Sequence, residues 1–302
     1  MSERVAAIDC GTNSIRLLIA DLVDGQLVEV DRRMTIVRLG QGVDATGAFA
    51  PEALARVFKA TEDFAAQLQS RAVTRLRFVA TSAARDVSNR DEFLAGIEER
   101  LGVRPEIISG REEAELSFRG ATTSLDLPAP YLVADIGGGS TELVLGDANG
   151  VRAAESLEIG SVRLTERHVT TDPISPAELA AITKDIDALL DSTTVPLADT
   201  RALIAVAGTA TTVAAVALDL PEYDRDAVHH AHLTAADVRR TTTWLTTSTR
   251  AERSAVRSIH PGRVDVIGAG ALILQRLTDR LPVDALTVSE HDILDGVALS
   301  LE

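Results

Sequence analysis

Two segments of the chain, residues 9–14 and 135–140, repeat one pattern: an apolar run ends in aspartate, and a glycine-containing turn leads into a second apolar run. The first segment reads Asp-Cys-Gly-Thr-Asn-Ser and the second reads Asp-Ile-Gly-Gly-Gly-Ser. Apolar runs on both sides of a short glycine turn are typical of two adjacent strands. Because the segments lie about one domain length apart, roughly 100–150 residues, the pattern predicts two domains built on the same plan.

The rest of the chain alternates between strand and helix patterns. Strands are expected at residues 5–8, 14–20, 26–30, 76–80, 105–108, 131–134, 141–145, 151–157, 202–206 and 285–288, and helices at residues 51–70, 90–101, 111–123, 175–190, 209–218, 234–246 and 262–280. This alternation predicts the α/β fold class, opened by an antiparallel meander. The Pro-rich segment 127–130 is the best linker candidate.

Composition limits the classes of partner. A net charge of −15 argues against a nucleic-acid-binding surface, which normally carries a basic patch. No apolar run reaches the roughly 18 residues that a membrane span needs, and the N-terminus lacks the layout of a signal peptide. The single cysteine, Cys10, excludes an internal disulfide framework and fits a reducing compartment. We therefore expect a cytoplasmic protein that binds neither membranes nor nucleic acid.

Each of the two turns carries groups that bind phosphate. Glycine allows backbone N–H groups to approach a phosphate oxygen closely, and hydroxyl groups add hydrogen bonds. The residues predicted to bind phosphate are Gly11, Thr12, Asn13 and Ser14 in the first turn, and Gly137, Gly138, Gly139, Ser140 and Thr141 in the second. A plain hairpin with a capping aspartate is the alternative for either turn alone, but the repetition favours phosphate binding.

A third glycine-containing element, residues 206–212, lies between an apolar strand and an alanine-rich helix. Backbone N–H groups at the start of a helix attract phosphate. Gly208 and Thr209 therefore join the predicted phosphate-binding set. For this element alone, the alternative is a strand-ending turn with a threonine cap.

Five segments in order resemble the motifs of the exopolyphosphatase / guanosine pentaphosphate phosphohydrolase (Ppx/GppA) family. They are residues 9–17, 81–85 (Thr-Ser-Ala-Ala-Arg), 107–114 (Ile-Ile-Ser-Gly-Arg-Glu-Glu-Ala), 135–142 and 207–211. The resemblance runs from Asp9 to about Gly296 and fits the short, two-domain form. It implies two ribonuclease-H-like domains of the actin and sugar-kinase superfamily flanking a central cleft, at residues 1–124 and 125–302. The last helix, about 292–302, is expected to pack back on the first domain.

The resemblance implies roles for several carboxylates. Glu113 matches the catalytic base that activates water, although from the residues alone Glu112 and Glu113 also fit the first-turn acids of a helix. Asp9, Asp135 and Glu142 match the acids of a divalent-metal site. Three carboxylates facing an anionic substrate make sense only with a cation. We expect Mg²⁺, with other divalent cations as alternatives and K⁺ as a further candidate.

Two arginines are the best candidates for phosphate contacts. Arg85 matches an arginine of the family motif, and Arg16 follows the first turn. Guanidinium groups suit phosphate geometry. A surface salt bridge is the alternative for each.

For the remaining candidate residues, a structural role is supported as well as a functional one, or better. The histidines at 229, 230 and 232 lack a companion ligand at zinc spacing, so a solvated loop is favoured. His260 and Arg263 fit either a position beside the substrate or capping and packing. The family resemblance implies no phosphate-contacting role for Asp295.

Together these features predict an exopolyphosphatase that releases terminal orthophosphate from inorganic polyphosphate, with Glu113 as general base. Guanosine pentaphosphate 5′-phosphohydrolase activity is the alternative, and a sugar-kinase-like phosphotransferase is the second. A catalytically silent nucleotide-binding regulator is a third possibility, disfavoured because the four acids are all retained. A homodimer is expected from the resemblance.

Overall fold

The structure, a computed structural model, describes residues 3–85, 87–123, 125 and 127–302. The chain divides into two compact units. Unit 1 comprises the described residues up to Thr123 together with His291–Glu302. Unit 2 comprises the described residues after Thr123 and up to Glu290. The predicted boundary between residues 124 and 125 falls on a position, 124, outside the described residues.

Unit 1 is built on a five-stranded sheet with the strand order β3-β2-β1-β4-β5. Its strands are β1 (Glu3–Cys10), β2 (Ser14–Val23), β3 (Gln26–Ile36), β4 (Arg75–Ala80) and β5 (Glu106–Ile107). Its helices are α1 (Val43–Thr46), α2 (Pro51–Ser70), α3 (Ser82–Arg85), α4 (Arg90–Leu101), α5 (Gly110–Thr122) and α13 (Ile293–Leu299). The first three strands form the predicted antiparallel meander, and β4 and β5 run parallel to β1.

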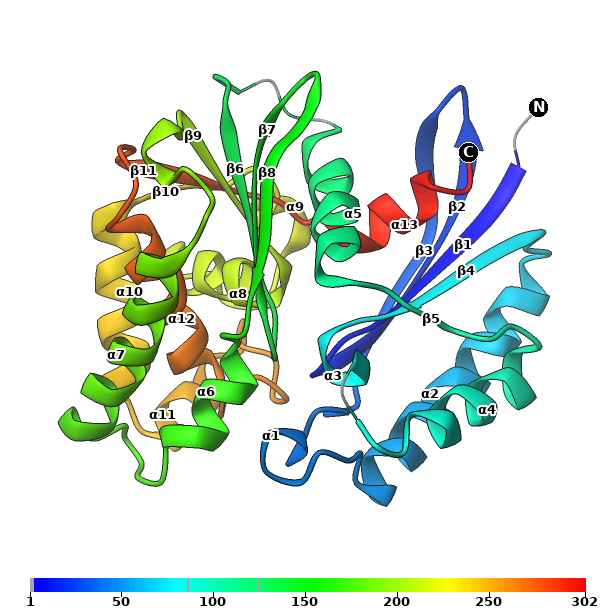
Figure 1. Cartoon of the computed structure of the whole chain (residues 1–302), viewed down its shortest axis with the longest axis horizontal. Coiled ribbons are helices and arrows are strands. Elements are labelled where there is room, and N and C mark those ends of the chain that lie inside the picture. Colours follow the sequence, from blue (N-terminus) through cyan, green and yellow to red (C-terminus); the bar gives the residue numbers. More distant parts are fainter. Residues whose placement is uncertain (1–2, 86, 124, 126) are drawn as a thin grey trace. The chain divides into compact units, whose positions relative to one another are not determined.

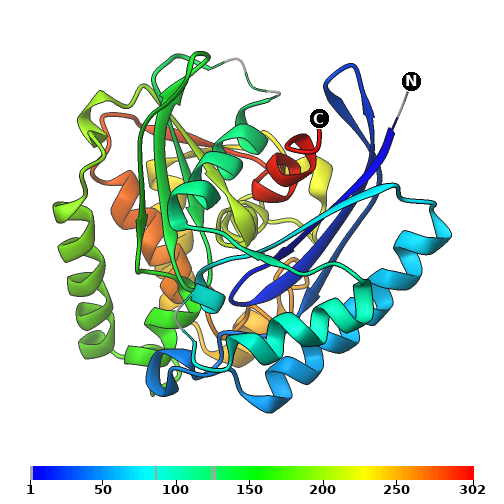
Figure 2. The same cartoon turned by 45° about the vertical axis from the view of Figure 1, so that its right-hand side comes forward.

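Helices cover both faces of this sheet (Figures 1 and 2). Successive residues of a strand point to opposite faces. Ala6 and Ile8 accordingly belong to the core cluster formed with α2 and α4, whereas Ala7 belongs to the cluster formed with α5 and α13. The sheet is therefore buried on both sides, and the end of β1 at Cys10 is fixed within the core.

Helices α5 and α13 pack backbone against backbone at two glycines. A Cβ atom on Gly120 would lie 1.9 Å from the carbonyl oxygen of Asp292, and a Cβ atom on Gly296 would lie 1.9 Å from that of Leu116. No side chain fits at either point. This contact ties α13 to unit 1, although the whole of unit 2 separates the two helices in the sequence.

Unit 2 is built on a six-stranded sheet with the order β10-β11-β9-β6-β7-β8. Its strands are β6 (Tyr131–Ile136), β7 (Thr141–Asp147), β8 (Gly150–Leu157), β9 (Ala202–Val206), β10 (His232–Thr234) and β11 (Ala285–Val288). Its helices are α6 (Ser161–His168), α7 (Pro176–Ser192), η1 (Leu197–Asp199), α8 (Ala207–Ala217), α9 (Arg225–Val228), α10 (Ala235–Thr247), α11 (Arg250–Ala255) and α12 (Ile267–Thr278).

The two sheets share one topology. In unit 2 an antiparallel meander, β6-β7-β8, is again continued by parallel strands, β9 and β11, on the side of its first strand. The short edge strand β10 is an addition. The predicted fold class, α/β with two ribonuclease-H-like domains, is confirmed.

Two predicted elements need correction. The helix expected from residue 262 begins at Ile267, because the residues before it form turns. The prediction of a loop at residues 229–232 is wrong for His232. This residue begins β10 and pairs with Thr287 of β11. Among the described residues, the helices are all too short or too polar to cross a membrane.

Candidate functional site

In unit 1, the first predicted turn joins β1 to β2. The Gly11 amide donates to the carbonyl oxygen of Ser14 at 2.9 Å. The loop after β3 covers the turn: the Gly40 amide donates to the Thr12 carbonyl oxygen at 2.8 Å, and the Val37 amide donates to that of Asn13 at 3.0 Å. Both carbonyls are thus occupied by protein, which fixes the conformation of the turn.

Two of the predicted residues beside this turn, Arg16 and Asp9, bind each other. Arg16 Nε and one terminal nitrogen donate to Asp9 Oδ2 at 3.0 and 2.6 Å, and its other terminal nitrogen donates to Asp292. Asp9 and Asp292 are both buried. Arg16 therefore lies in a buried ion-pair network rather than in a surface salt bridge, and its role as a phosphate ligand stays a prediction.

The surroundings of the two carboxylates differ. Burial raises the pKa of Asp9, and the charge of Arg16 opposes that rise. Burial also acts to raise the pKa of Asp292, but Arg16 and Arg32 outweigh it and hold that pKa below its ordinary value. Asp292 was missed by sequence reasoning, because nothing local to residues 289–296 indicates a partner in β2.

Glu113 and Arg85, which the sequence places 28 positions apart, are also in contact. A terminal nitrogen of Arg85 donates to Glu113 Oε2, and Arg85 Nε donates to the Ile108 carbonyl oxygen at 3.2 Å. Glu113 is buried in the first turn of α5, which Ser109 caps by accepting from the Glu112 amide. The structure thus brings the predicted base and a predicted phosphate-binding arginine together.

Glu112 behaves differently from its neighbour. Its side chain is 44% exposed and accepts from Arg77 at 2.7 Å. It fits the role of an exposed acid at the start of a helix, where the macrodipole favours negative charge.

In unit 2, the second predicted turn joins β6 to β7 and repeats the bond of the first. The Gly137 amide donates to the Ser140 carbonyl oxygen at 3.0 Å. Helix α6 packs directly on this turn: the Val162 amide donates to the Gly138 carbonyl oxygen at 2.8 Å, and Arg163 Nε donates to that of Gly139 at 2.8 Å. The carbonyl groups point to α6, so the turn is held by a helix that the sequence did not reveal.

Close packing at Gly160 explains how α6 approaches the turn. A Cβ atom on Gly160 would lie 2.4 Å from the backbone of Gly138. Only glycine allows this contact.

Two predicted metal ligands face each other across neighbouring strands. Asp135 of β6 is the direct partner of Glu142 of β7, and both are buried. Glu142 Oε1 accepts from the Ser156 hydroxyl at 2.7 Å. Like charges directly opposite on a sheet destabilise it, so the pair fits a site that binds a cation. Over the described part of the chain, no group of three or more His, Cys, Asp or Glu side chains gathers as a metal site would.

The third predicted turn lies at the junction of β9 and α8. Ala207 adopts a φ of +64°, a left-handed conformation that is uncommon for a residue with a side chain and concentrates at functional sites. The Arg263 guanidinium lies against Gly208, where a Cβ atom would be 1.8 Å from its nitrogen. A terminal nitrogen of Arg263 donates to the Thr212 hydroxyl at 3.3 Å. Thr209 is buried.

His260, whose role the sequence left open, has a local structural partner. Its Nδ1 accepts from the Gly262 amide at 3.1 Å. Burial and then the charge of Arg263 lower its pKa below the ordinary value. Of this pair, Arg263 is the residue that contacts a predicted phosphate-binding turn.

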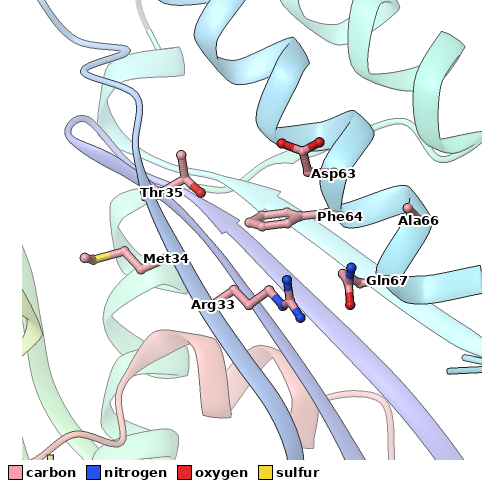
Figure 3. Close-up of a pocket in the computed structure, with 7 residues that line it drawn as sticks. All are labelled: Arg33, Met34, Thr35, Asp63, Phe64, Ala66 and Gln67. Atoms are coloured by element: carbon pink, nitrogen blue, oxygen red, sulfur yellow. The ribbon is translucent and has the colours of Figure 1, made fainter. Parts of the chain in front are cut away.

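A cavity of about 560 Å³ lies elsewhere in unit 1, between β3 and α2 (Figure 3). Arg33 and Thr35 line it from β3, and Asp63, Phe64 and Gln67 line it from α2. None of the predicted site residues lines this cavity.

Known proteins resemble the chain over nearly its whole length. It is 50% identical to Exopolyphosphatase 2 of Mycobacterium tuberculosis, over 99% of this chain and 98% of that protein. A crystal structure of an exopolyphosphatase-like protein is 45% identical, with a TM-score of 0.96 over 99% of this chain and 98% of the other. An exopolyphosphatase from Cytophaga hutchinsonii is 28% identical, with a TM-score of 0.91 over 99% and 97%. Residues 18–302 match the Ppx/GppA phosphatase family. The chain therefore belongs to the Ppx/GppA phosphatase family.

Proposed function

We propose that this protein is an exopolyphosphatase, a phosphoanhydride hydrolase that releases terminal orthophosphate from inorganic polyphosphate. The contact between buried Glu113 and Arg85 carries the proposal, since it joins a general base to a phosphate-binding cation. The 50% identity with a relative named Exopolyphosphatase 2 supports the substrate. We also propose that units 1 and 2 correspond to the two predicted domains.

In the proposed reaction, Glu113 accepts a proton from water as the water oxygen bonds to the terminal phosphorus. The bond from that phosphorus to the bridging oxygen breaks, and the shortened chain leaves with this oxygen. Arg85 pairs with the carboxylate form of Glu113, the form that can accept a proton. Arg85 and the N–H groups of the turns stabilise charge on the phosphoryl oxygens.

The residues present fit Mg²⁺. Asp135 and Glu142 are buried acids paired across neighbouring strands, and Mg²⁺ commonly takes one or two carboxylates plus water and phosphate oxygens. When bound, the ion supplies positive charge that neutralises phosphate oxygens. Asp9 is a further proposed ligand. Three further predictions remain: that K⁺ also binds, that the protein is cytoplasmic, and that it forms a homodimer.

Phosphate release measured with malachite green tests the function. We expect release from polyphosphate in Mg²⁺ buffer, loss of release when EDTA removes the metal, and recovery when Mg²⁺ is added in excess. Guanosine pentaphosphate in a parallel assay distinguishes the alternative substrate. Phosphoryl transfer from ATP to a sugar, without phosphate release from polyphosphate, would show a kinase and contradict the proposal.

A further inference from the structure

One arginine in unit 1 serves two buried carboxylates. Arg16 bonds to Asp9 at the end of β1 and to Asp292 just before α13. The side chains of Asp9 and Asp292 are only 6% and 4% exposed. Buried charges are costly unless they are compensated, so these two buried acids need more positive charge than Arg16 alone provides.

The neighbouring guanidinium group, that of Arg32, does not supply the missing positive charge. Arg32 donates to both oxygens of Asp295, at 3.2 and 2.5 Å, and to Glu29 at 2.9 Å. Three buried acids, at positions 9, 292 and 295, therefore face two guanidinium groups among the described residues. One negative charge is left over.

One carboxylate oxygen of this group receives no hydrogen bond. Both bonds from Arg16 to Asp9 end on Oδ2. Asp9 Oδ1 is buried and has no hydrogen-bond partner among the described residues. A guanidinium usually pairs with both oxygens of a carboxylate through two parallel bonds. Nε and the adjacent terminal nitrogen can make that pairing side-on, as Arg4 does with the two oxygens of Asp21. In Arg16 the other terminal nitrogen is held by Asp292, and in this position Nε and the adjacent nitrogen both end on Asp9 Oδ2.

We propose that Asp292 is a positioning residue for the divalent cation: by sharing Arg16 it keeps Asp9 Oδ1 unoccupied by protein and directed to the metal. This inference rests on the proposed function, in which Asp9 is a metal ligand. The role of Asp292 is indirect, since it acts on Asp9 through Arg16.

The position of Asp292 is itself set by α5. The Asp292 carbonyl oxygen lies against Gly120, and Asp292 Oδ1 accepts from the Leu294 amide at 3.0 Å, which caps α13. Its own amide donates to Asp295 Oδ2 at 3.0 Å. With its backbone and Oδ1 held in this way, Asp292 accepts from Arg16 through Oδ2.

Mn²⁺ binding to the substrate-free protein, followed by electron paramagnetic resonance, tests the proposal. Asp292→Asn keeps the capping oxygen but loses the charge that draws Arg16. We expect the Mn²⁺ dissociation constant to rise about tenfold, as is usual when a partner of a metal ligand is lost. The Mg²⁺ concentration for half-maximal phosphate release should rise similarly, with kcat at saturating Mg²⁺ changed less than about threefold.

Asp295→Asn is the matched control. Asp295 is equally buried, pairs with an arginine and belongs to the same capping box, but its arginine does not contact Asp9. A merely structural role for Asp292 would make the two variants alike in Mn²⁺ affinity. We expect Asp295→Asn to bind Mn²⁺ as the wild type does.

A double variant checks the route through Asp9. Asp9→Asn should weaken Mn²⁺ binding, and adding Asp292→Asn should weaken it no further, because the two changes act on one ligand. Unchanged Mn²⁺ affinity in folded Asp292→Asn, or full additivity, would overturn the proposal. Failure of the proposed function would instead appear as absence of phosphate release in the wild type, while Mn²⁺ binding would still be measured.

Discussion

Glu113→Gln is expected to lower kcat for phosphate release from polyphosphate by about 10²–10⁴-fold, the usual contribution of a general base. Glutamine has nearly the same shape but cannot accept a proton from water. It can still accept a hydrogen bond from Arg85, so the fold of α5 should persist. Initial rates at saturating Mg²⁺ and substrate measure the effect, and thermal unfolding checks the fold.

Glu112→Gln provides the comparison for that experiment. It makes the same chemical change one residue away, on a side chain that is 44% exposed and bonded to Arg77. Its kcat should stay within about threefold of wild type. Equal losses in the two variants, or full activity in folded Glu113→Gln, would mean that Glu113 is not the base.

Gly120→Ala is expected to destabilise unit 1 by about 3 kcal/mol or more, at the upper end of overpacking effects. The added methyl group would overlap the backbone of Asp292, with 1.9 Å between Cβ and the carbonyl oxygen, and backbone cannot move aside as a side chain can. In an unconstrained helix the same change would stabilise by about 1 kcal/mol. The sign of the effect therefore reports the α5–α13 contact.

Denaturant unfolding measures this loss. Glu115→Ala, on the exposed part of α5, is the control and should change stability by no more than about 0.5 kcal/mol. A Gly120→Ala protein as stable as the wild type would show that α13 does not pack on α5 as described.

Local patterns were sufficient to predict much of the fold. The helix at residues 51–70 has proline at its first position and an apolar stripe, and the structure gives it the same bounds. The strands at 202–206 and 285–288 are short apolar runs, and they too have the predicted bounds. The two turns were predictable because each contains its own glycine and hydroxyl groups, and they share one closing hydrogen bond.

Features that depend on distant partners were not predictable. Helix α6 follows Gly160 and has only 8 residues, and its first turn is supported by carbonyl groups of the turn at 137–139. The contact of Arg263 with Gly208 and that of Asp292 with Arg16 join segments far apart in the sequence. No single-sequence periodicity encodes such pairs.

The placement of α13 in unit 1 has a consequence for biosynthesis. A ribosome completes residues 3–123 long before it adds α13, so unit 1 initially lacks the helix that covers Ala7, Leu18 and Val79 in its core. Unit 2 is continuous in sequence and can fold as it emerges. Domains usually fold in the order of their synthesis, but in this chain the order should be reversed. During that interval α5 alone would cover one apolar face of the nascent N-terminal sheet, so we expect this part of the chain to be a chaperone substrate.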